Sequence, residues 1–252
     1  MLPILYKSSY FTLYAYPLFM GIAWGVGFNL TKYLFQKNNE DQSNLLKLFV
    51  GLFLAGWIGA KFFFLQLSAK EKIYQYIYAD YFWLGGGFVF YGGLIFGIGF
   101  YLLYSLYYKK FNFQKTYLLI PGLAFGHGIG RLGCFLTGCC YGSKCDLPWA
   151  LKVAGEFRHP VQLYEACALF FLGLLTLKWI KIKSMHQQIV TNYLILYSIM
   201  RFFLEFFRGD EIRGIFLTSF SMHLSSAQLI SLGIFFGAGF IRYYLIRQTQ
   251  PS

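Results

Sequence analysis

The chain has 252 residues, of which 57% are hydrophobic and only 13% are charged. A soluble domain carries about 25% charged residues, so this composition excludes an ordinary soluble protein. The net charge of +12 does not indicate nucleic-acid binding, because the basic residues lie between apolar runs and form no single patch.

Seven apolar runs approach or reach the length of about 20 residues that a helix needs to cross a bilayer. They lie at about 12–32, 46–66, 86–108, 117–137, 163–180, 189–207 and 226–246. The linkers between them are short, and the sequence suggests no second domain or repeat. We therefore expect an all-α, polytopic protein with seven transmembrane helices that form a single integral membrane domain over residues 1–252.

Two lysine-rich linkers set the expected orientation. They are KKFNFQK at 109–115 and KWIKIK at 178–183, and both fall on the same side of the expected bundle. Cytoplasmic loops carry an excess of Lys and Arg, which predicts an N-terminus outside and a C-terminus in the cytoplasm. The unusual polar residues then gather on the outer side, where we expect the site.

The fourth run contains an arginine, Arg131, within GLAFGHGIGRLGCFLTGCCYG (122–142). A charge near the middle of a bilayer costs at least ~2.5 kcal/mol, so it persists where it meets a cavity, a partner or a ligand. The many glycines around Arg131 indicate either close helix packing or a space kept open for a substrate, and we favour the space. His127, alone on an apolar helix, is more often a packing residue than a base.

Three charged residues, Arg201, Glu205 and Arg208, lie in RFFLEFFRGDE (201–211). Their i, i+4 and i+7 spacing places them on one helical face, so Glu205 can pair with either arginine. One interpretation is a structural ion-pair ladder at a helix end. The other is an anion site, because a guanidinium presents a planar fork of donors that matches phosphate oxygens.

RHPVQLYE (158–165) begins the fifth run. Pro160 suits a helix entry, and Glu165 is expected in the first turn, where the helix dipole favours it. His159 and Glu165 are either structural residues at this helix entry or members of a functional site. Gln162 and Tyr164 are expected to tie the outer loop to the fourth run.

Four of the five cysteines form C-x4-C-C-x4-C: Cys134, Cys139, Cys140 and Cys145. On the outer face a disulfide is one alternative. A zinc site is disfavoured because paired C-x2-C units are missing, so we expect no metal. Tyr91, before two glycines in GGGFVFYGG (85–93), is either a buried aromatic residue or a phenol that orients a nucleophile.

Together these motifs resemble the prolipoprotein diacylglyceryl transferase family. The segment GIGRLGCFLTGCCYG is similar to the family's glycine-flanked arginine signature, and it includes Gly142. RHPVQLYE, RFFLEFFR and SAQLIS (226–231) resemble three further family motifs in the right order, and Tyr16 falls where the family has a functional tyrosine. The resemblance covers residues 12–246.

The resemblance implies transfer of the diacylglyceryl group of phosphatidylglycerol to the thiol of a lipobox cysteine in a prolipoprotein signal peptide. Glycerol phosphate leaves, a thioether forms, and no cofactor or metal is required. Arg131 and Arg201 are expected to contact the lipid phosphate, with Glu205 supporting the second arginine. The expected catalytic residues are Arg131, Arg201, Tyr91, Glu205 and Tyr16. The expected substrate-binding residues are Arg131, Arg201, Arg208, Gly92, Gly93, Gly142, His159, Gln162, Glu165 and Gln228.

The implied location is the bacterial cytoplasmic membrane, with the active site facing the outer side. Many family members carry a histidine where this chain has Tyr91, and a phenol of pKa about 10 is a poorer base at neutral pH. The identity of the proton acceptor is therefore left open. Two other classes stay as alternatives: a transporter or flippase for an anionic lipid, and an inactive paralogue that binds lipid.

Overall fold

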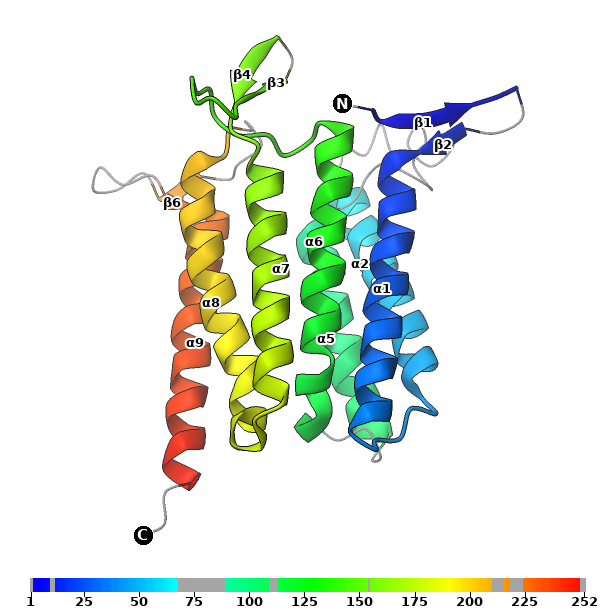
Figure 1. Cartoon of the computed structure of the whole chain (residues 1–252), viewed down its shortest axis with the longest axis vertical. Coiled ribbons are helices and arrows are strands. Elements are labelled where there is room, and N and C mark those ends of the chain that lie inside the picture. Colours follow the sequence, from blue (N-terminus) through cyan, green and yellow to red (C-terminus); the bar gives the residue numbers. More distant parts are fainter. Residues whose placement is uncertain are drawn as a thin grey trace. The chain divides into compact units, whose positions relative to one another are not determined.

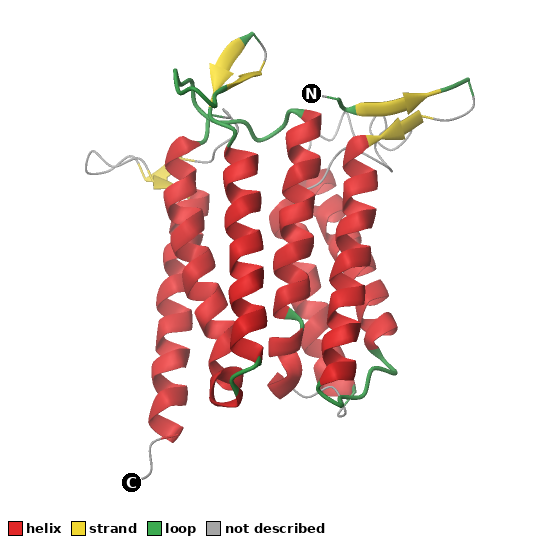
Figure 2. Ribbon diagram, in the orientation of Figure 1, coloured by secondary structure: helices red, strands yellow, loops and turns green. Residues whose placement is uncertain are grey.

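The computed structural model describes residues 2–9, 12–67, 89–108, 113–153, 155–209, 215–217 and 224–249. Long helices make up most of this part of the chain, and the short strands lie before α1 (Ala15–Lys37) or between helices (Figure 1 and Figure 2). The chain divides into two compact units, one of Met1–Gly27 with Thr116–Ser252 and one of Phe28–Lys115.

The unit of Phe28–Lys115 contains the end of α1 (Ala15–Lys37), α2 (Leu45–Leu67) and α5 (Phe90–Tyr107). Glycines allow α2 and α5 to pack closely: a Cβ added at Gly59 would lie 2.4 Å from the carbonyl oxygen of Gly92. The Tyr104 hydroxyl donates to the carbonyl of Asn44 at 2.7 Å. Small residues that bring backbones together are typical of helix pairs in membranes.

The other unit contains the start of α1 and four long helices. These are α6 (Ile120–Thr137), α7 (Val161–Ile180), α8 (Ile189–Leu204) and α9 (Ser226–Thr249). Helix α7 packs against both α6 and α8, and α9 packs against α8 (Figure 1). Short 3-10 turns, η2 (Phe113–Leu118), η3 (Lys183–Gln188) and η4 (Glu205–Phe207), adjoin α6 and α8.

Three antiparallel strand pairs lie in the described part of the chain, one before α1 and two between helices. They are β1 (Ile4–Lys7) with β2 (Thr12–Tyr14), β3 (Leu151–Val153) with β4 (Glu156–Arg158), and β5 (Ile215–Leu217) with β6 (Leu224–Ser225). The apolar pattern of the sequence did not predict them. The first helix was expected from about residue 12 and begins at Ala15, because 12–14 form β2.

Local sequence fixes two of the helix ends. Helix α6 has Pro121 in its first turn and stops at Gly138, whose left-handed φ of 75° suits a residue without a Cβ. Helix α9 starts with a capping box: Ser225 N–H donates to Gln228 Oε1 at 3.0 Å, and Gln228 N–H donates to Ser225 Oγ at 3.3 Å.

The helices of the described residues fall on the apolar runs of the sequence. Four segments are long and apolar enough to cross a membrane: Leu45–Gln66, Val161–Ile180, Lys183–Phe207 and Ser226–Arg247. Large apolar side chains also point outward, as Phe240 on α9 does with 72% of its surface exposed. A surface of this kind suits lipid rather than water. The prediction of a helical membrane protein is confirmed.

Candidate active site

Arg131 and Glu165 form an ion pair between α6 and α7. Arg131 Nη2 lies 2.9 Å from Glu165 Oε1, and only 16% and 2% of the two side chains are exposed. Helix α7 begins at Val161, so Glu165 is its fifth residue and not part of the first turn as expected. A buried charge needs a partner of opposite sign, and this pairing accounts for both residues better than the helix dipole does for Glu165.

Arg201, Glu205 and Arg208 come together as their spacing predicts. Arg201 Nη1 lies 2.8 Å from Glu205 Oε2, and Arg208 Nη1 lies 3.9 Å from the same oxygen. Helix α8 ends at Leu204 and continues as the 3-10 turn η4, so the three residues still share one side of the chain. Glu205 is only 3% exposed, which makes it a buried support for Arg201.

His127 connects the two ion pairs. Its Nε2 lies 3.8 Å from Glu165 Oε1, and its ring lies 5.8 Å from that of Tyr197 on α8. The imidazole interacts electrostatically with Arg131, Glu165 and Arg201. The two arginine–glutamate pairs therefore belong to one charged cluster that α6, α7 and α8 share.

Tyr16, near the start of α1, belongs to the same region. Its hydroxyl interacts electrostatically with Arg131 and with Cys134. A Cβ at Gly133 would lie 2.9 Å from that of Phe19, so this glycine lets α1 approach α6 closely. The structure thus brings the predicted tyrosine and the predicted arginine together.

The expectation that the glycines around Arg131 keep a space open is wrong for three of them. A Cβ at Gly126 would lie 3.0 Å from the carbonyl oxygen of Ala23, and one at Gly128 would lie 2.5 Å from the ring of Phe170. Gly133 meets α1, as described. Neighbouring helices fill the space beside these glycines, so the glycines serve helix packing.

Gly142 holds a crossing of three backbone segments beyond α6. Its N–H donates to the carbonyl of His159 at 3.1 Å, and a Cβ added to it would lie 2.4 Å from that same oxygen. On the other side, Gly209 N–H donates to Tyr141 O at 3.1 Å and Ser143 N–H donates to Phe207 O at 2.8 Å. The segments that enter α7 and leave η4 are thereby fixed to the end of α6.

Other predicted site residues make contacts that position the backbone. Gln162 Nε2 donates to Cys139 O at 2.6 Å, which ties α7 to the loop after α6 as predicted. Tyr164 instead accepts a hydrogen bond from Trp149 Nε1 at 2.7 Å, and its hydroxyl lies 3.4 Å from His159 Nδ1. Gln228 is a member of the α9 capping box.

Three predicted site residues, Gly92, Gly93 and Tyr91, lie in the unit of Phe28–Lys115. Gly92 and Gly93 face Gly59 and Gly56 at the crossing of α2 and α5. Tyr91 belongs to α5 by its backbone, but its side chain lies outside the described part of the structure. The prediction for its phenol stays a prediction.

Sequence reasoning missed the link between Glu165 and Arg131 and the position of His127 between the ion pairs. The sequence did contain a sign of this link. Glu165 is an acidic residue in an apolar helix, and such a residue needs a partner of opposite charge. All five cysteines are free in the structure.

Fold and site together define a helical membrane protein that holds a cluster of buried charges among its helices. Residues 3–244 match the family described as prolipoprotein diacylglyceryl transferase, and the chain belongs to this family. The chain is 28% identical over 246 residues to the phosphatidylglycerol–prolipoprotein diacylglyceryl transferase of Clostridium tetani, covering 93% of this chain and 96% of that protein. It is 33% identical over 231 residues to phosphatidylglycerol–prolipoprotein diacylglyceryl transferase 2 of Clostridium perfringens, covering 86% of this chain and 86% of that protein. The identity to the Buchnera aphidicola protein of that name is 31% over 267 residues, covering 91% of this chain and 88% of that protein.

Proposed function

We propose that this protein transfers the diacylglyceryl group of phosphatidylglycerol to the thiol of the lipobox cysteine of a prolipoprotein. The observation that carries the proposal is the cluster in which Glu165 holds Arg131 at 2.9 Å and Glu205 holds Arg201 at 2.8 Å. Family membership supports the same reaction, since the relatives are named for it.

In the proposed reaction, the peptide sulfur attacks the glycerol carbon that bears the phosphate. A carbon–sulfur bond forms, the carbon–oxygen bond breaks, and the electron pair leaves on the phosphate oxygen of glycerol phosphate. Arg131 and Arg201 bind the phosphate and stabilise the charge that develops on it. Each guanidinium has five N–H donors, so it can keep its glutamate and still donate to a phosphate oxygen.

The remaining predicted residues have supporting roles in this proposal. Tyr16 borders Arg131 and helps to orient the lipid headgroup, and Tyr91 orients the thiol. Gly142, His159 and Gln162 position the segments that carry the charged cluster. Arg208 adds positive charge beside Glu205, while Gly92, Gly93 and Gln228 fix helix packing and the start of α9.

The proposed setting is the bacterial cytoplasmic membrane. Seven crossings are proposed, with the N-terminus outside, the active site facing the outer side and residues 1–252 forming a single membrane domain. The lysine-rich linkers support this orientation. Phosphatidylglycerol is then available from the surrounding bilayer, and the peptide is available from the outer surface.

One experiment separates transfer from transport or simple lipid binding. Purified protein is incubated with phosphatidylglycerol and a lipobox peptide, and the peptide is analysed by mass spectrometry. We expect the peptide cysteine to gain the mass of one diacylglyceryl group. Lipid binding without any mass gain would contradict the transferase and leave a transporter or an inactive paralogue.

A further inference from the structure

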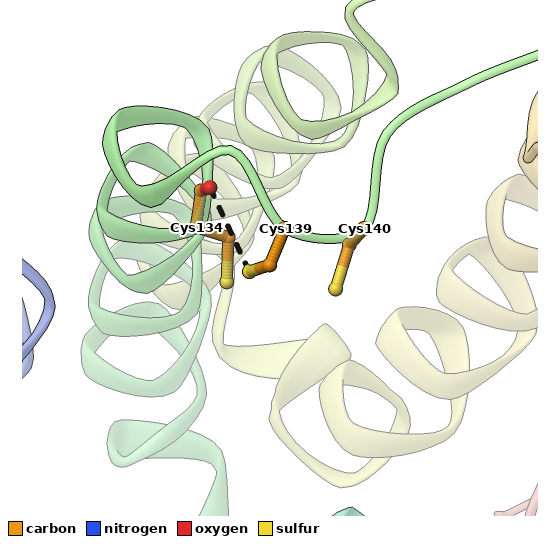
Figure 3. A group of neighbouring side chains, drawn as sticks. All are labelled: Cys134, Cys139 and Cys140. Carbon is orange, nitrogen blue, oxygen red and sulfur yellow. Dashed lines mark hydrogen bonds between the residues drawn. The ribbon is translucent and has the colours of Figure 1, made fainter. Parts of the chain in front are cut away.

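Three cysteine thiols meet at the end of α6 that is nearest to Arg131. Cys134 lies in the last turn of α6, and Cys139 and Cys140 follow the helix directly. The sulfur atoms of all three lie within 4.8 Å of one another. Figure 3 shows the three side chains together, with the Cys139 thiol directed at the carbonyl oxygen of Cys134, 3.7 Å away.

The backbone makes a specific turn to bring these thiols together. Gly138 is left-handed, with φ at 75°, and Cys140 is also left-handed, with φ at 59°. A left-handed conformation is uncommon for a residue other than glycine and carries strain of order 1–3 kcal/mol. The buried side chain of Gln162 holds the carbonyl of Cys139 at 2.6 Å and so supports the turn.

A positive charge acts on the three thiols, since the guanidinium of Arg131 interacts electrostatically with Cys139. Arg131 also interacts electrostatically with Cys134 and Cys140. Thiolate is the form that binds metals and reacts as a nucleophile.

We propose that Cys134, Cys139 and Cys140 form a binding site for a thiophilic metal ion of the zinc type. Soft thiolate ligands select ions of this kind. A tetrahedral zinc ion with Zn–S bonds of about 2.3 Å needs sulfur atoms roughly 3.8 Å apart, so no pair of sulfur atoms would have to close by more than about 1 Å. The proposal departs from the sequence-based expectation of no metal, which rested on the lack of paired C-x2-C units.

Three protein ligands leave a fourth position open, as in catalytic zinc sites. The ligand that fits this position is the thiol of the substrate peptide, and this part rests on the proposed function. On binding, the peptide sulfur forms a bond to the metal and its proton leaves to solvent, because a coordinated thiol is deprotonated. The site would thus supply the thiolate that Tyr91, a poor base, leaves unexplained.

Metal binding is tested first, without lipid or peptide. The reduced full-length protein is titrated with Co²⁺ as a spectroscopic probe for Zn²⁺, and bound zinc is counted by elemental analysis. We expect one ion per chain and a sulfur-to-cobalt charge-transfer band. Cys139→Ser should lower zinc affinity at least about 100-fold, beyond the 10–100-fold typical of outer-shell changes.

The matched control is the double variant with Cys145→Ser and Cys167→Ser, which removes the two cysteines outside the cluster. It should bind zinc as the wild type does. Binding that is absent in the wild type, or equal in the control and in Cys139→Ser, would overturn the metal site.

The role of the open position is tested separately. Lipobox peptide should shift the cobalt spectrum, and a chelator that strips the metal should lower the transfer rate at least about 10-fold, with recovery on adding Zn²⁺. Full transfer by protein shown to be metal-free would overturn the thiol role while leaving the transferase function intact. Absence of transfer by the zinc-loaded protein would instead contradict the proposed function.

Discussion

Glu165 places a carboxylate oxygen 2.9 Å from Arg131 where almost none of its side chain is exposed. The sequence suggested a supporting acid for Arg201 but none for Arg131. In the structure both arginines have one, and His127 lies between the pairs. Removing one partner of a buried ion pair costs about 3–5 kcal/mol, because the other charge stays buried alone.

Glu165→Gln tests this pair. We expect the variant to lower the transfer rate at least about 100-fold, because Arg131 loses the carboxylate that orients it towards the phosphate. The rate is measured with purified protein at saturating phosphatidylglycerol. Glu156→Gln, which alters an acid of the β3–β4 hairpin, is the control and should keep the wild-type rate. Equal rates in both variants would show that Arg131 needs no support from Glu165.

Tyr91→Phe tests the phenol that stands where many family members have a histidine. We expect the rate to fall about 10-fold or more while lipid binding changes less, since the hydroxyl is proposed to act on the thiol and not on the lipid. Turnover and lipid affinity are measured on the same preparation. Unchanged turnover would show that the hydroxyl is not used.

At the residue scale, charged residues within apolar helices were the feature of the sequence that predicted the site. It identified Arg131, Arg201 and Glu205, and the helical spacing of the last two predicted their contact. It did not find the partner of Arg131, because that contact joins α6 to α7 and depends on how the two helices pack. The sequence likewise showed the spacing of the three cysteines but not that their thiols meet, because that contact depends on the left-handed turn at Gly138 and Cys140.

The elements that carry the site are helices fixed to one another by glycines and by backbone hydrogen bonds. Apolar runs predicted the helices to within a few residues, because length and hydropathy decide them. The short hairpins escaped prediction. Strands of two to four residues are too short to show a clear alternation of apolar and polar residues.

Gly142→Ala tests the backbone crossing beyond α6. A methyl group there would lie 2.4 Å from the carbonyl oxygen of His159, so we expect a loss of about 1–3 kcal/mol in stability, with reduced transfer. Thermal unfolding in detergent and the transfer rate are the measurements. Gly237→Ala is the matched control, because nothing lies within 4 Å of its added methyl on α9. Equal unfolding temperatures in both variants would show that the close contact between Gly142 and His159 does not contribute to stability.

The β3–β4 hairpin gives a pH-dependent prediction. Glu156 pairs with Lys144 and with Arg158, and the hydrogen bond from Lys144 is the main cause that lowers the pKa of Glu156. Since the folded-state pKa lies below the unfolded value of about 4.3, the pairing stabilises the hairpin above that pH and is lost as pH falls.

The measurement compares hydrogen exchange of residues 151–158 in the wild type and in Glu156→Gln at each pH. We expect slower exchange in the wild type at pH 7, with the difference shrinking as the pH falls below about 4 and also shrinking in high salt. A difference that grows as pH falls would be the wrong sign for this mechanism.

At the scale of the whole molecule, the described helices expose apolar side chains and bury the Arg131–Glu165 and Arg201–Glu205 ion pairs among them. This is the reverse of a soluble protein and suits a bilayer. The composition and the long apolar runs of the sequence predicted a membrane protein. The number of crossings and the orientation depend on where Lys and Arg fall in the loops, and they stay predictions.

The predicted orientation is testable by fusing reporters to the C-terminus and to the 178–183 linker. A reporter that is active only in the cytoplasm should be active at both positions, and one that is active only outside should be silent. The same pair of reporters at residue 2 should give the opposite result. Periplasmic activity at the C-terminus would reverse the orientation and with it the proposed outer face of the site.

Arg131 is proposed to hold the phosphate through the planar fork of its guanidinium. Arg131→Lys keeps the positive charge but replaces the fork by a point charge. The most direct measurement is therefore the rate at which this variant attaches diacylglyceryl to a lipobox peptide, relative to wild type. We predict a loss of at least about 100-fold, of the order found when a transition-state donor is removed. Full activity in Arg131→Lys would show that the phosphate does not need the guanidinium fork of Arg131.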